Sequence, residues 1–511
     1  MTKARIEGLT SWESDWSGLR VLVLGMGVTG FSVVDTLMEL HCEVVVATPT
    51  IDETHRQILE VLGAELLLAD LNSAVPDRAI EFDPELVIVS PGFAPHHPIV
   101  KWVESTNAQL WGDIELAWRV RDKFGSPAEW ICVTGTNGKT TTTELTASIL
   151  RASGFKAVAT GNVGFPILDA IRDPYKFEVL VVELSSFQLH YLGEMHPWSS
   201  VCLNIADDHL DWHSGVENYR KAKGKIYENT KVACIYNRDD LVTRTLVENA
   251  NVKEGCRAIG FGLGVPGLSD FGIVEGIACD RAFLEDRANQ ALELFHIEEL
   301  AGTGLDSPHL LADCLAASAL ARSFGAEIPA LAEAILSFRP SAHRMEVVES
   351  VDGIAWIDDS KATNPHAASA SLSGFESVVW IVGGLFKGAP TADLVAKHAS
   401  RLKAAIVIGV ERAEIVASLT RHAPGVPVVE LEVAQTGDVM QSAVAAAADF
   451  AKPGDVVLLA PAAASMDQFV DYADRGRQFA QAVKERIGGS GNANQSSTGT
   501  TPETTTKSRR K

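Results

Sequence analysis

The segment VTGTNGKTTTTEL, residues 133–145, constrains the fold more than any other part of the sequence. It starts at the end of an apolar run, passes through glycines to Lys139, and continues into threonines at the start of an expected helix. Bare backbone N–H groups, the positive end of a helix and a lysine cation together suit a polyphosphate. The segment therefore predicts a strand, a phosphate loop and a helix within an α/β fold.

This loop departs from the common pattern GxxxxGK[ST], which would require glycine where Val133 stands. The remaining residues are still expected to bind nucleotide phosphates: Gly135, Thr136, Asn137, Gly138, Lys139, Thr140 and Thr141. The Thr140 hydroxyl is placed to ligate phosphate-bound Mg²⁺. The alternative is a glycine-rich turn with an incidental lysine.

The chain has 511 residues, a length that favours about three domains. Apolar runs separated by helical-length segments recur in three successive sets. We therefore expect an α/β protein of three consecutive domains, each a mainly parallel Rossmann-like sheet with helices, the central one a P-loop-type ATPase. The expected ranges are 1–127, 128–340 and 341–487, followed by a polar, disordered tail over 488–511.

The composition excludes several classes of protein. A formal charge of −22 disfavours a nucleic-acid partner, because phosphate backbones are bound by clustered cations. The seven cysteines, with no CxxC pair, indicate reduced residues in a reducing compartment. With no export signal and no apolar run of about 18 residues, we expect a cytoplasmic protein without membrane insertion.

A second glycine turn, GMGVTG over residues 25–30, follows the first apolar strand and matches GxGxxG. A nicotinamide dinucleotide would need an acidic residue at the end of the next strand, but VVVATPT has no carboxylate before Asp52. The turn is therefore expected to contact some other nucleotide or phosphate.

Polar side chains follow two later strands. Glu183 comes directly after a buried strand, and His209 lies in NIADDHLDWH after the next. Because ligands bind at the carboxyl ends of parallel strands, both residues are candidates to join Thr140 around Mg²⁺. The alternative is a solvated acidic loop with a satisfied histidine.

Two charged stretches leave alternatives open. NYRKAKGKIYEN carries four cations at helical spacing, which suits a solvent face or a desolvated lysine that reacts with carbon dioxide to form a carbamate. AHRMEVV and IDDSKATNPHA are either a charged linker or part of a site at the start of the third set of strands. The residues in question are His343, Arg344, Asp358, Asp359, Lys361 and Asn364.

Taken in order, TGTNGKT, GNVG, VELSSFQL, DDHLDWH, YRKAKGKIY, HRME and DDSKATN resemble the Mur ligase family over residues 20–485. SPGF, GDIELAW and APAAASMDQFVDYADRGRQF resemble the member that adds D-glutamate. The resemblance implies a monomeric, ATP-dependent ligase that joins D-glutamate to UDP-N-acetylmuramoyl-L-alanine through an acyl phosphate, in peptidoglycan precursor synthesis.

The resemblance also implies roles for individual residues. The UDP-substrate would be bound by Gly27, Val28, Thr29, Ser90, Pro91, Gly92 and Asn162. Two Mg²⁺ ions would be held by Thr140, Glu183, His209 and a carbamylated Lys223, with Lys139, His209 and Lys223 as catalytic residues. ATP would also contact Asp313, Arg344 and Asp359, and D-glutamate would contact Lys361, Thr363, Lys387, Ser465 and Tyr472.

Two strings differ from the family pattern. SPHLLADCLAASA has Leu310 and Asp313 where asparagines are expected, so Asp313 retains an acceptor but loses an amide donor. GGLFKGA lacks the usual polar residues before Lys387. Two other functions remain open: a folylpolyglutamate synthetase-like ligase, against which the N-terminal nucleotide-fold unit argues, and a non-catalytic nucleotide-binding scaffold.

Overall fold

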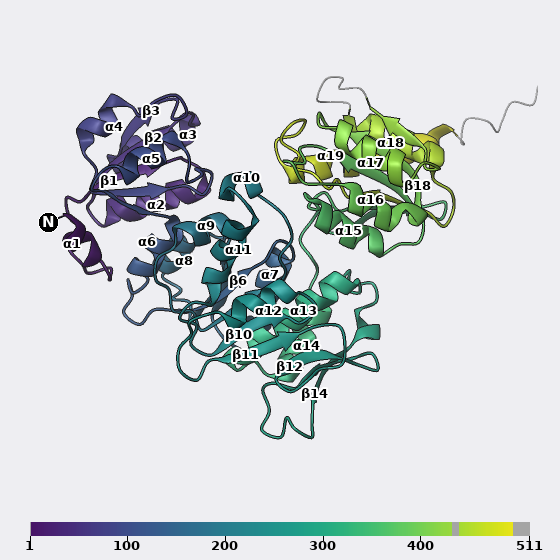
Figure 1. Ribbon diagram of the computed structural model, residues 1–511, viewed down its shortest axis with the longest axis horizontal. Coiled ribbons are helices and arrows are strands. Elements are labelled where there is room, and N and C mark those ends of the chain that lie inside the picture. The colour runs from purple at the N-terminus through teal and green to yellow at the C-terminus, as the bar shows by residue number, and fades with distance from the viewer. Residues whose placement is uncertain (1, 432–438, 494–511) are drawn as a thin grey trace, which may run out of the picture. The chain divides into compact units, whose positions relative to one another are not determined.

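The computed structural model describes residues 2–431 and 439–493 (Figure 1). The chain divides into two compact units, with the boundary between Pro340 and Ser341. The first unit contains a five-stranded and a nine-stranded sheet, and the second contains a six-stranded sheet. The expected α/β class with mainly parallel sheets is confirmed, whereas the division into three domains stays a prediction.

The first sheet has the order β3-β2-β1-β4-β5, and all its strand pairs are parallel. Its strands are β1 (Arg20–Leu24), β2 (Glu43–Thr48), β3 (Glu65–Leu68), β4 (Leu86–Val89) and β5 (Gln109–Trp111). The helices are α1 (Thr2–Glu7), α2 (Val28–Glu39), α3 (Glu53–Leu62), α4 (Asp77–Phe82), α5 (Pro98–Glu104) and α6 (Asp113–Val120). Since β1 lies between β2 and β4, the turns after β1 and β4 meet at one sheet edge.

The second sheet has the order β14-β13-β12-β11-β10-β9-β6-β8-β7. Its parallel strands are β6 (Glu129–Thr134), β7 (Ala157–Gly161), β8 (Val179–Glu183), β9 (Ser199–Cys202), β10 (Ala233–Asn237), β11 (Arg257–Phe261) and β12 (Asp270–Val274). Two antiparallel strands, β13 (Ile277–Asp280) and β14 (Leu292–His296), complete the edge. The central strand β6 lies between β8 and β9, so the loops after these three strands are neighbours.

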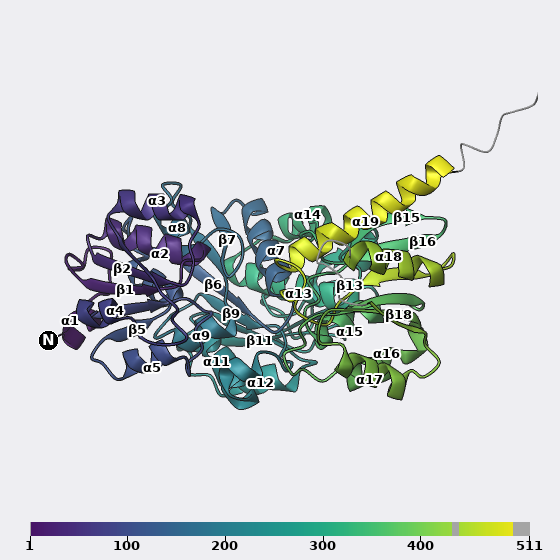
Figure 2. The same cartoon turned by 90° about the horizontal axis from the view of Figure 1, so that it is seen from above.

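Helices cover both faces of this sheet because side chains of β6 alternate between two cores. Ile131 and Val133 pack with α7 (Lys139–Ala152), α13 (Pro308–Phe324) and α14 (Ile328–Ser337). Trp130 and Cys132 pack with the opposite layer, where α9 and α11 lie side by side (Figure 2). The other helices are α8 (Ile167–Arg172), α9 (Ser186–Tyr191), α10 (Leu210–His213), α11 (Val216–Gly224), α12 (Leu241–Glu248), η1 (Lys225–Tyr227) and η2 (Ile297–Leu300).

The third sheet has the order β15-β16-β20-β17-β18-β19, with β15 antiparallel and the other pairs parallel. Its strands are β15 (Glu346–Val351), β16 (Ile354–Asp358), β17 (Val378–Gly383), β18 (Leu402–Ile408), β19 (Val428–Glu430) and β20 (Val456–Leu459). One core contains α15 (Pro365–Ser373), α16 (Ala392–His398) and α17 (Ala413–His422), and the other contains α18 (Val439–Phe450) and α19 (Tyr472–Ala493). A short turn, η3 (Ala399–Arg401), precedes β18.

Three further expectations concern the tail, the cysteines and the membrane. Helix α19 continues to Ala493, so residues 488–493 of the expected tail are helical, and 494–511 lie outside the described residues. All seven cysteines are free, and all except Cys256 are buried. Within the described ranges, no helix combines the length and apolar character needed to cross a bilayer.

Candidate functional site

The phosphate loop joins β6 to α7 at the carboxyl end of the central sheet. Gly138 has a φ of +83°, and a Cβ at this position would lie 2.3 Å from Asp313 Oδ1, so only glycine fits. The loop is held from the β9 side, because the Thr136 and Asn137 amides donate to the backbone and side-chain oxygens of Asn204, each at 2.9 Å. The predicted strand, loop and helix are therefore all present.

The Lys139 side chain bonds to the backbone of its own loop. Its Nζ donates to the carbonyl oxygens of Gly135 at 2.9 Å and Thr136 at 2.8 Å. The neighbouring Thr140 side chain is half-buried, and the buried Thr141 hydroxyl has no hydrogen-bond partner among the described residues. The amine and hydroxyl thus lie in the first turn of α7, where a helix N-terminus favours anions.

Glu183 ends β8 and is 2% exposed. Its Oε1 accepts a 2.8 Å hydrogen bond from Asn162 Nδ2, whereas the buried Oε2 has no partner in the described part of the chain. The next residue, Leu184, bonds through its N–H to the Val133 carbonyl at 2.9 Å, which places Glu183 beside the phosphate loop. A buried carboxylate oxygen without a donor is a suitable ligand for a hard cation such as Mg²⁺.

Lys223 of α11 is 2% exposed, so the expected alternative of a solvent-facing lysine is wrong for this residue. Its Nζ donates to the Gly135 carbonyl at 2.7 Å and the Thr134 hydroxyl at 3.1 Å. Burial, reinforced by the charge of Lys139, lowers the pKa of Lys223 to about 7. A substantial fraction of this amine is therefore neutral at neutral pH, as reaction with carbon dioxide requires.

His209 lies beyond β9 and precedes α10, in a left-handed backbone conformation with φ of 53°. Its Nε2 is 3.5 Å from Asp208 Oδ2, and its ring meets the Phe187 ring edge-on at 4.7 Å between centroids. Phe187 belongs to α9, which follows Glu183. The loops after β6, β8 and β9 thus bring the predicted metal and phosphate residues to one edge of the sheet.

Asp313 packs against the phosphate loop from α13 and is 5% exposed. Leu310, one turn earlier, is buried in the core shared with α7. The two departures from the expected asparagines thus differ in consequence, because Leu310 became part of the apolar core whereas Asp313 places a carboxylate beside Gly138.

The predicted UDP-binding turns are neighbours at the edge of the first sheet. A Cβ on Gly25 would lie 2.7 Å from Ser90 Oγ, and the Ser90 amide bonds to the Leu24 carbonyl at 3.0 Å. Gly27 precedes α2, whose first two residues are Val28 and Thr29. The backbone segment with Ser90, Pro91 and Gly92 therefore lies beside the glycine turn.

Three loops of the third sheet carry the predicted amino-acid pocket. The loops after β16, β20 and β17 are adjacent: the Ala462 amide bonds to the Ala362 carbonyl at 2.9 Å, and Leu385 and Ala464 exchange two bonds of 2.9 Å. These contacts bring together the loops of Lys361, Thr363, Lys387 and Ser465. Lys361 Nζ lies 3.8 Å from the centre of the Tyr472 ring.

The predicted nucleotide contacts of the second unit lie at its first strands. The Asp359 carboxylate accepts hydrogen bonds from the Met345 amide at 3.2 Å and from the Ser371 hydroxyl. Burial raises its pKa to about 6, and the nearby charge of Arg344 opposes this rise. Asp359 and Arg344 therefore lie close enough to interact within this unit.

Sequence reasoning overlooked several buried contacts. The Tyr219 hydroxyl pairs with the Thr136 hydroxyl at 2.8 Å, and Asp113 Oδ2 accepts from Gln188 Nε2 at 3.1 Å. Arg475, which is fully buried in α19, bonds to the loop after β16 and to the loop after β20. Only the motif strings GDIELAW, YRKAKGKIY and DRGRQF marked these residues, and their contacts come from distant parts of the chain.

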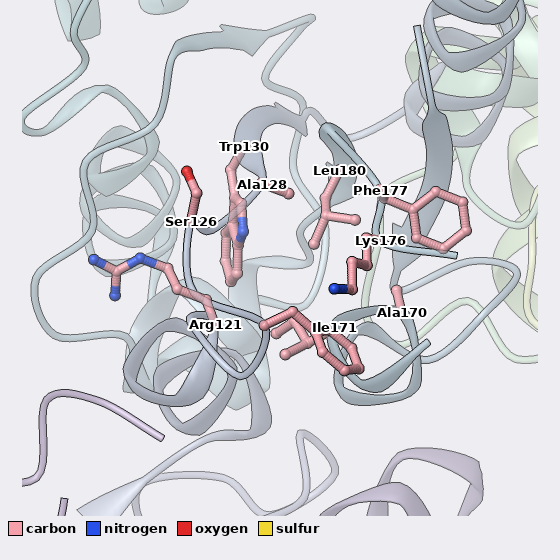
Figure 3. Close-up of a pocket in the computed structure, with 10 residues that line it drawn as sticks. Arg121, Ser126, Ala128, Trp130, Ala170, Ile171, Lys176, Phe177 and Leu180 are labelled. Atoms are coloured by element: carbon pink, nitrogen blue, oxygen red, sulfur yellow. The ribbon is translucent and has the colours of Figure 1, made fainter. Parts of the chain in front are cut away.

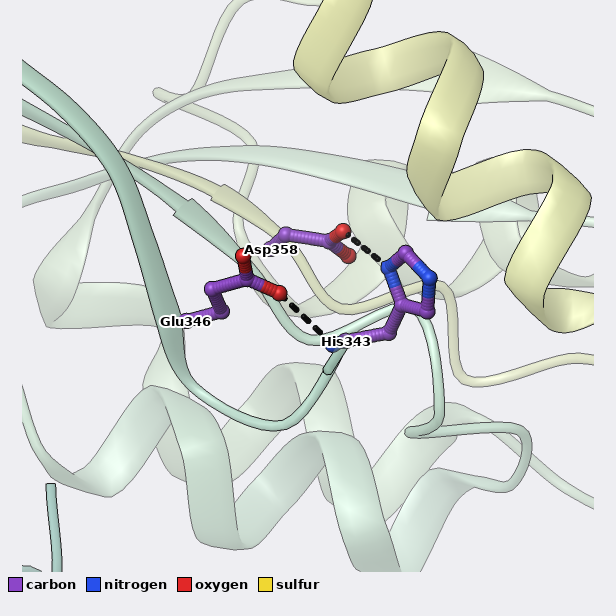
Figure 4. A group of neighbouring side chains, drawn as sticks. All are labelled: His343, Glu346 and Asp358. Atoms are coloured by element: carbon purple, nitrogen blue, oxygen red, sulfur yellow. Dashed lines mark hydrogen bonds and ion pairs between the residues drawn. The ribbon is translucent and has the colours of Figure 1, made fainter. Parts of the chain in front are cut away.

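His343, Glu346 and Asp358 form a hydrogen-bonded group at the start of the second unit (Figure 4). His343 Nδ1 lies 2.6 Å from Asp358 Oδ2, and the His343 amide donates to Glu346 Oε2 at 2.9 Å. A Cβ on Gly476 of α19 would lie only 2.2 Å from His343 Nδ1. His343 and Asp358 are bonded to each other and packed against α19, whereas Glu346 is exposed, so these contacts join the start of the second unit to α19.

A pocket at the opposite edge of the central sheet contains none of the predicted site residues (Figure 3). It lies beside Trp130 and Leu180, at the starts of β6 and β8, and Arg121 and Lys176 also line it. The candidate functional site is therefore at the carboxyl ends of the strands, where the side chains predicted to bind phosphate and metal converge.

The fold and the site define a class of α/β protein in which a phosphate loop, a buried acid and a buried lysine meet at the edge of a mainly parallel sheet. Two family models match the chain: "Mur ligase middle domain" over residues 133–270 and "Mur ligase, glutamate ligase domain" over residues 343–463. The first range includes the phosphate loop, and the second includes Lys361, Thr363 and Lys387 of the predicted amino-acid pocket.

Relatives match over nearly the whole length. The chain is 56% identical over 500 residues to the UDP-N-acetylmuramoylalanine–D-glutamate ligase of Leifsonia xyli subsp. xyli, covering 96% of each chain. It is 48% identical over 476 residues to the enzyme of the same name from Streptomyces coelicolor, covering 92% of this chain and 99% of that one. The chain therefore belongs to the Mur ligase family, which confirms the resemblance in its motifs.

Solved structures of the family share the fold. The UDP-N-acetylmuramate-alanine ligase MurC of Thermotoga maritima matches with a TM-score of 0.55 at 19% identity, covering 92% of this chain and 100% of that one. The MurF ligase of the same organism, solved in complex with ADP, matches with a TM-score of 0.53 at 19% identity, covering 92% and 96%.

Proposed function

We propose that this chain joins D-glutamate to UDP-N-acetylmuramoyl-L-alanine with cleavage of ATP to ADP and phosphate, forming an amide bond in peptidoglycan precursor synthesis. The observation that carries this proposal is the 56% identity, over 96% of both chains, to a UDP-N-acetylmuramoylalanine–D-glutamate ligase. The alternative of a non-catalytic scaffold is disfavoured by the buried positions of Glu183 and Lys223 beside the phosphate loop.

The first chemical step would activate the alanine carboxylate by phosphorylation. A free carboxylate resists attack by an amine because it is anionic and lacks a good leaving group. Transfer of the γ-phosphoryl group of ATP to the alanine carboxylate would give an acyl phosphate and remove both obstacles. The loop amides and Lys139 would bind the phosphates, with the Lys139 amine moving from the Gly135 and Thr136 carbonyls to phosphate oxygens.

Mg²⁺ fits this site on the evidence of its donors. Glu183 Oε2 is buried beside the loop with no partner among the described residues, and the Thr140 hydroxyl lies in the first turn of α7. His209 and a carbamate on Lys223 would complete the ligands of two ions. Bound Mg²⁺ would neutralise charge on the phosphoryl oxygens during transfer. Arg344, Asp359 and Asp313 are proposed to contact the nucleotide.

The lysine carbamate is proposed because the Lys223 amine combines burial with a pKa of about 7. Its nitrogen would attack carbon dioxide, and the proton released would pass to solvent, leaving an anionic group with two oxygens. A carboxylate-like group at this place would bring negative charge next to Lys139 and supply metal-ligating oxygens.

The second step requires a neutral amine on D-glutamate, which would attack the acyl carbon and release phosphate. The carboxylates of the amino acid would be bound by Lys387, Lys361 and the Ser465 hydroxyl, with Thr363 and Tyr472 beside them. The turns after β1 and β4, together with Asn162, would bind the UDP-linked substrate. His209 is a candidate proton acceptor, in competition with metal ligation.

The proposed use of ATP and a nucleotide-linked substrate supports a cytoplasmic location. A monomer is sufficient for the proposed reaction because each proposed contact comes from this chain.

One assay tests the function: the purified protein is given ATP, UDP-N-acetylmuramoyl-L-alanine and an equimolar mixture of D-glutamate, L-glutamate and L-lysine. Mass analysis should find one product carrying a single D-glutamate. Incorporation of another amino acid, or ATP turnover with dihydrofolate and glutamate instead, would overturn the proposal.

A further inference from the structure

Arg475 is a buried cation that has no ion-pair partner among the described residues. It lies in the first turn of α19 and is 0% exposed. No carboxylate of residues 2–431 or 439–493 comes within salt-bridge distance of its guanidinium group. A buried arginine normally requires such a partner, because removing a cation from water is costly.

The two acids whose charges act on Arg475, Asp358 and Asp467, make hydrogen bonds to other groups. Asp358 bonds to His343 Nδ1 at 2.6 Å and to the Ser360 amide at 2.9 Å, and Asp467 Oδ2 accepts from the Val410 amide at 2.9 Å. Burial lowers the pKa of Arg475 to about 9, which leaves it charged at neutral pH. The charges of Asp467 and Asp358 oppose part of this lowering, so the positive charge of Arg475 is partly compensated within the protein.

The hydrogen bonds of Arg475 explain its position. Nε donates to Ser360 Oγ at 2.9 Å, Nη2 donates to the Ser360 carbonyl at 2.9 Å, and Nη1 donates to the Ala463 carbonyl at 3.1 Å. One planar guanidinium group therefore joins the loop after β16 to the loop after β20. We call these three hydrogen bonds the fork. A lysine has a single side-chain nitrogen and cannot make all three.

Both loops lead directly to the predicted amino-acid pocket. Ser360 precedes Lys361, and Ala463 lies two residues before Ser465. The Ser360 hydroxyl also donates to the Tyr472 carbonyl at 2.7 Å, and the Lys361 amine lies 3.8 Å from the centre of the Tyr472 ring. Arg475 is therefore connected through the backbone and Ser360 to Lys361, Ser465 and Tyr472, although it is itself fully buried.

We propose that Arg475 is a positioning residue for the amino-acid pocket, which aligns the loops that carry Lys361 and Ser465. This inference rests on the proposed function. Three hydrogen bonds from one planar group fix the two loops relative to each other. The effect is therefore specific to the amino acid and leaves the nucleotide substrates unaffected.

The test compares three variants of the full chain. Arg475→Met removes both the fork and the charge, Arg475→Lys keeps the charge, and Ser360→Ala keeps the cation but removes one acceptor. Arg477→Met is the matched control, because Arg477 lies in the same helix with its side chain 62% exposed. Steady-state KM and kcat are measured separately for D-glutamate, ATP and UDP-N-acetylmuramoyl-L-alanine, with circular dichroism to verify folding.

We expect Arg475→Met to raise the KM for D-glutamate by 30-fold or more, and Arg475→Lys and Ser360→Ala to raise it about 3-fold to 10-fold. The KM values for ATP and the UDP-linked substrate should stay within 2-fold, as should all constants of Arg477→Met. If Arg475→Met does not fold, the other two variants decide. Folded Arg475→Lys and Ser360→Ala proteins with an unchanged KM for D-glutamate, or an equal rise for all three substrates, would overturn the inference. Wild-type protein that fails to use D-glutamate would instead overturn the proposed function.

Discussion

The side-chain nitrogen of Lys223 lies 2.7 Å from the carbonyl oxygen of Gly135, the residue that opens the phosphate loop. This bond joins α11 to the loop after β6. It also holds a second amine near Lys139, whose Nζ bonds to the same Gly135 carbonyl at 2.9 Å. Two lysines directed at one carbonyl oxygen repel each other, which favours the neutral form of Lys223.

Replacement of Lys223 by alanine should reduce product formation at least 100-fold, because the proposed carbamate oxygens are lost. Added acetate or formate should restore part of the rate by supplying a carboxylate in the space left by the side chain. The measurement is the initial rate of amide formation with and without the acid. Lys221→Ala, on the exposed face of the same helix, should retain the wild-type rate. A fully active Lys223→Ala protein would contradict the proposed role.

The pKa of Lys223 also predicts how stability depends on pH. Above about pH 7 the folded chain has released the Lys223 proton, whereas the unfolded chain keeps it up to about pH 10.5. The free energy of unfolding should therefore rise with pH between about 7 and 10, by at most about 1.4 kcal/mol per pH unit from this group. Below about pH 7 both states are protonated, and the cost of burying the charge remains in full.

Denaturant unfolding of the wild type and of Lys223→Met in buffers without carbon dioxide isolates this contribution. The difference between the two free energies of unfolding should change in favour of the wild type as the pH rises from 7 to 9. A difference that does not change with pH would show that Lys223 keeps its proton in the folded state.

Glu183→Gln should weaken Mg²⁺ binding at the proposed site while preserving the local structure. The glutamine Oε1 can still accept from Asn162 Nδ2, which is 2.8 Å from Glu183 Oε1, but an NH₂ group replaces the unpartnered Oε2. We expect the half-saturating Mg²⁺ concentration to rise at least 10-fold, measured from initial rates in a Mg²⁺ titration. Glu254→Gln, at an exposed position, is the control. An unchanged Mg²⁺ titration would exclude Glu183 as a ligand.

Gly138→Ala should abolish ATP turnover. The new Cβ would lie 2.3 Å from Asp313 Oδ1, at a φ of +83° that disfavours any other residue. Gly154→Ala separates the two effects, because Gly154 has a φ of +89° but no atom within 4 Å of its added Cβ. It should cost only about 1 kcal/mol of stability and leave turnover intact. Comparable turnover in both variants would show that the loop tolerates displacement.

Much of the site could be predicted because turn chemistry and the ends of strands are local features of sequence. The glycines around Lys139 marked the phosphate loop, and Glu183 follows an apolar run directly, so its place at a strand end required no knowledge of the fold. The same reasoning placed the GMGVTG and SPG turns at strand ends. It did not show that the two turns are neighbours, since that depends on β1 pairing with β4.

Other features depended on tertiary structure. In NYRKAKGKIYEN, Lys221 and Lys223 have similar local surroundings, yet Lys221 is exposed and Lys223 is buried against the phosphate loop. Likewise, Arg475 and Arg477 are two residues apart in one helix, but only Arg475 joins the two loops of the third sheet. Helix periodicity predicts that such residues differ in direction, but not which direction faces the protein.

The sequence by itself determined the α/β class, the family and the residues capable of binding phosphate, metal and carboxylate. The tertiary structure alone decided that burial lowers the pKa of Lys223 and that Arg475 is buried. It also decided that Glu183 Oε2 has no hydrogen-bond partner among the described residues. The physical reason is that turn and strand signals depend on a few adjacent residues. Desolvation and hydrogen-bond partners, by contrast, are set by side chains that can lie far away in the sequence, as the bond between Arg475 and Ser360 illustrates with a separation of 115 positions.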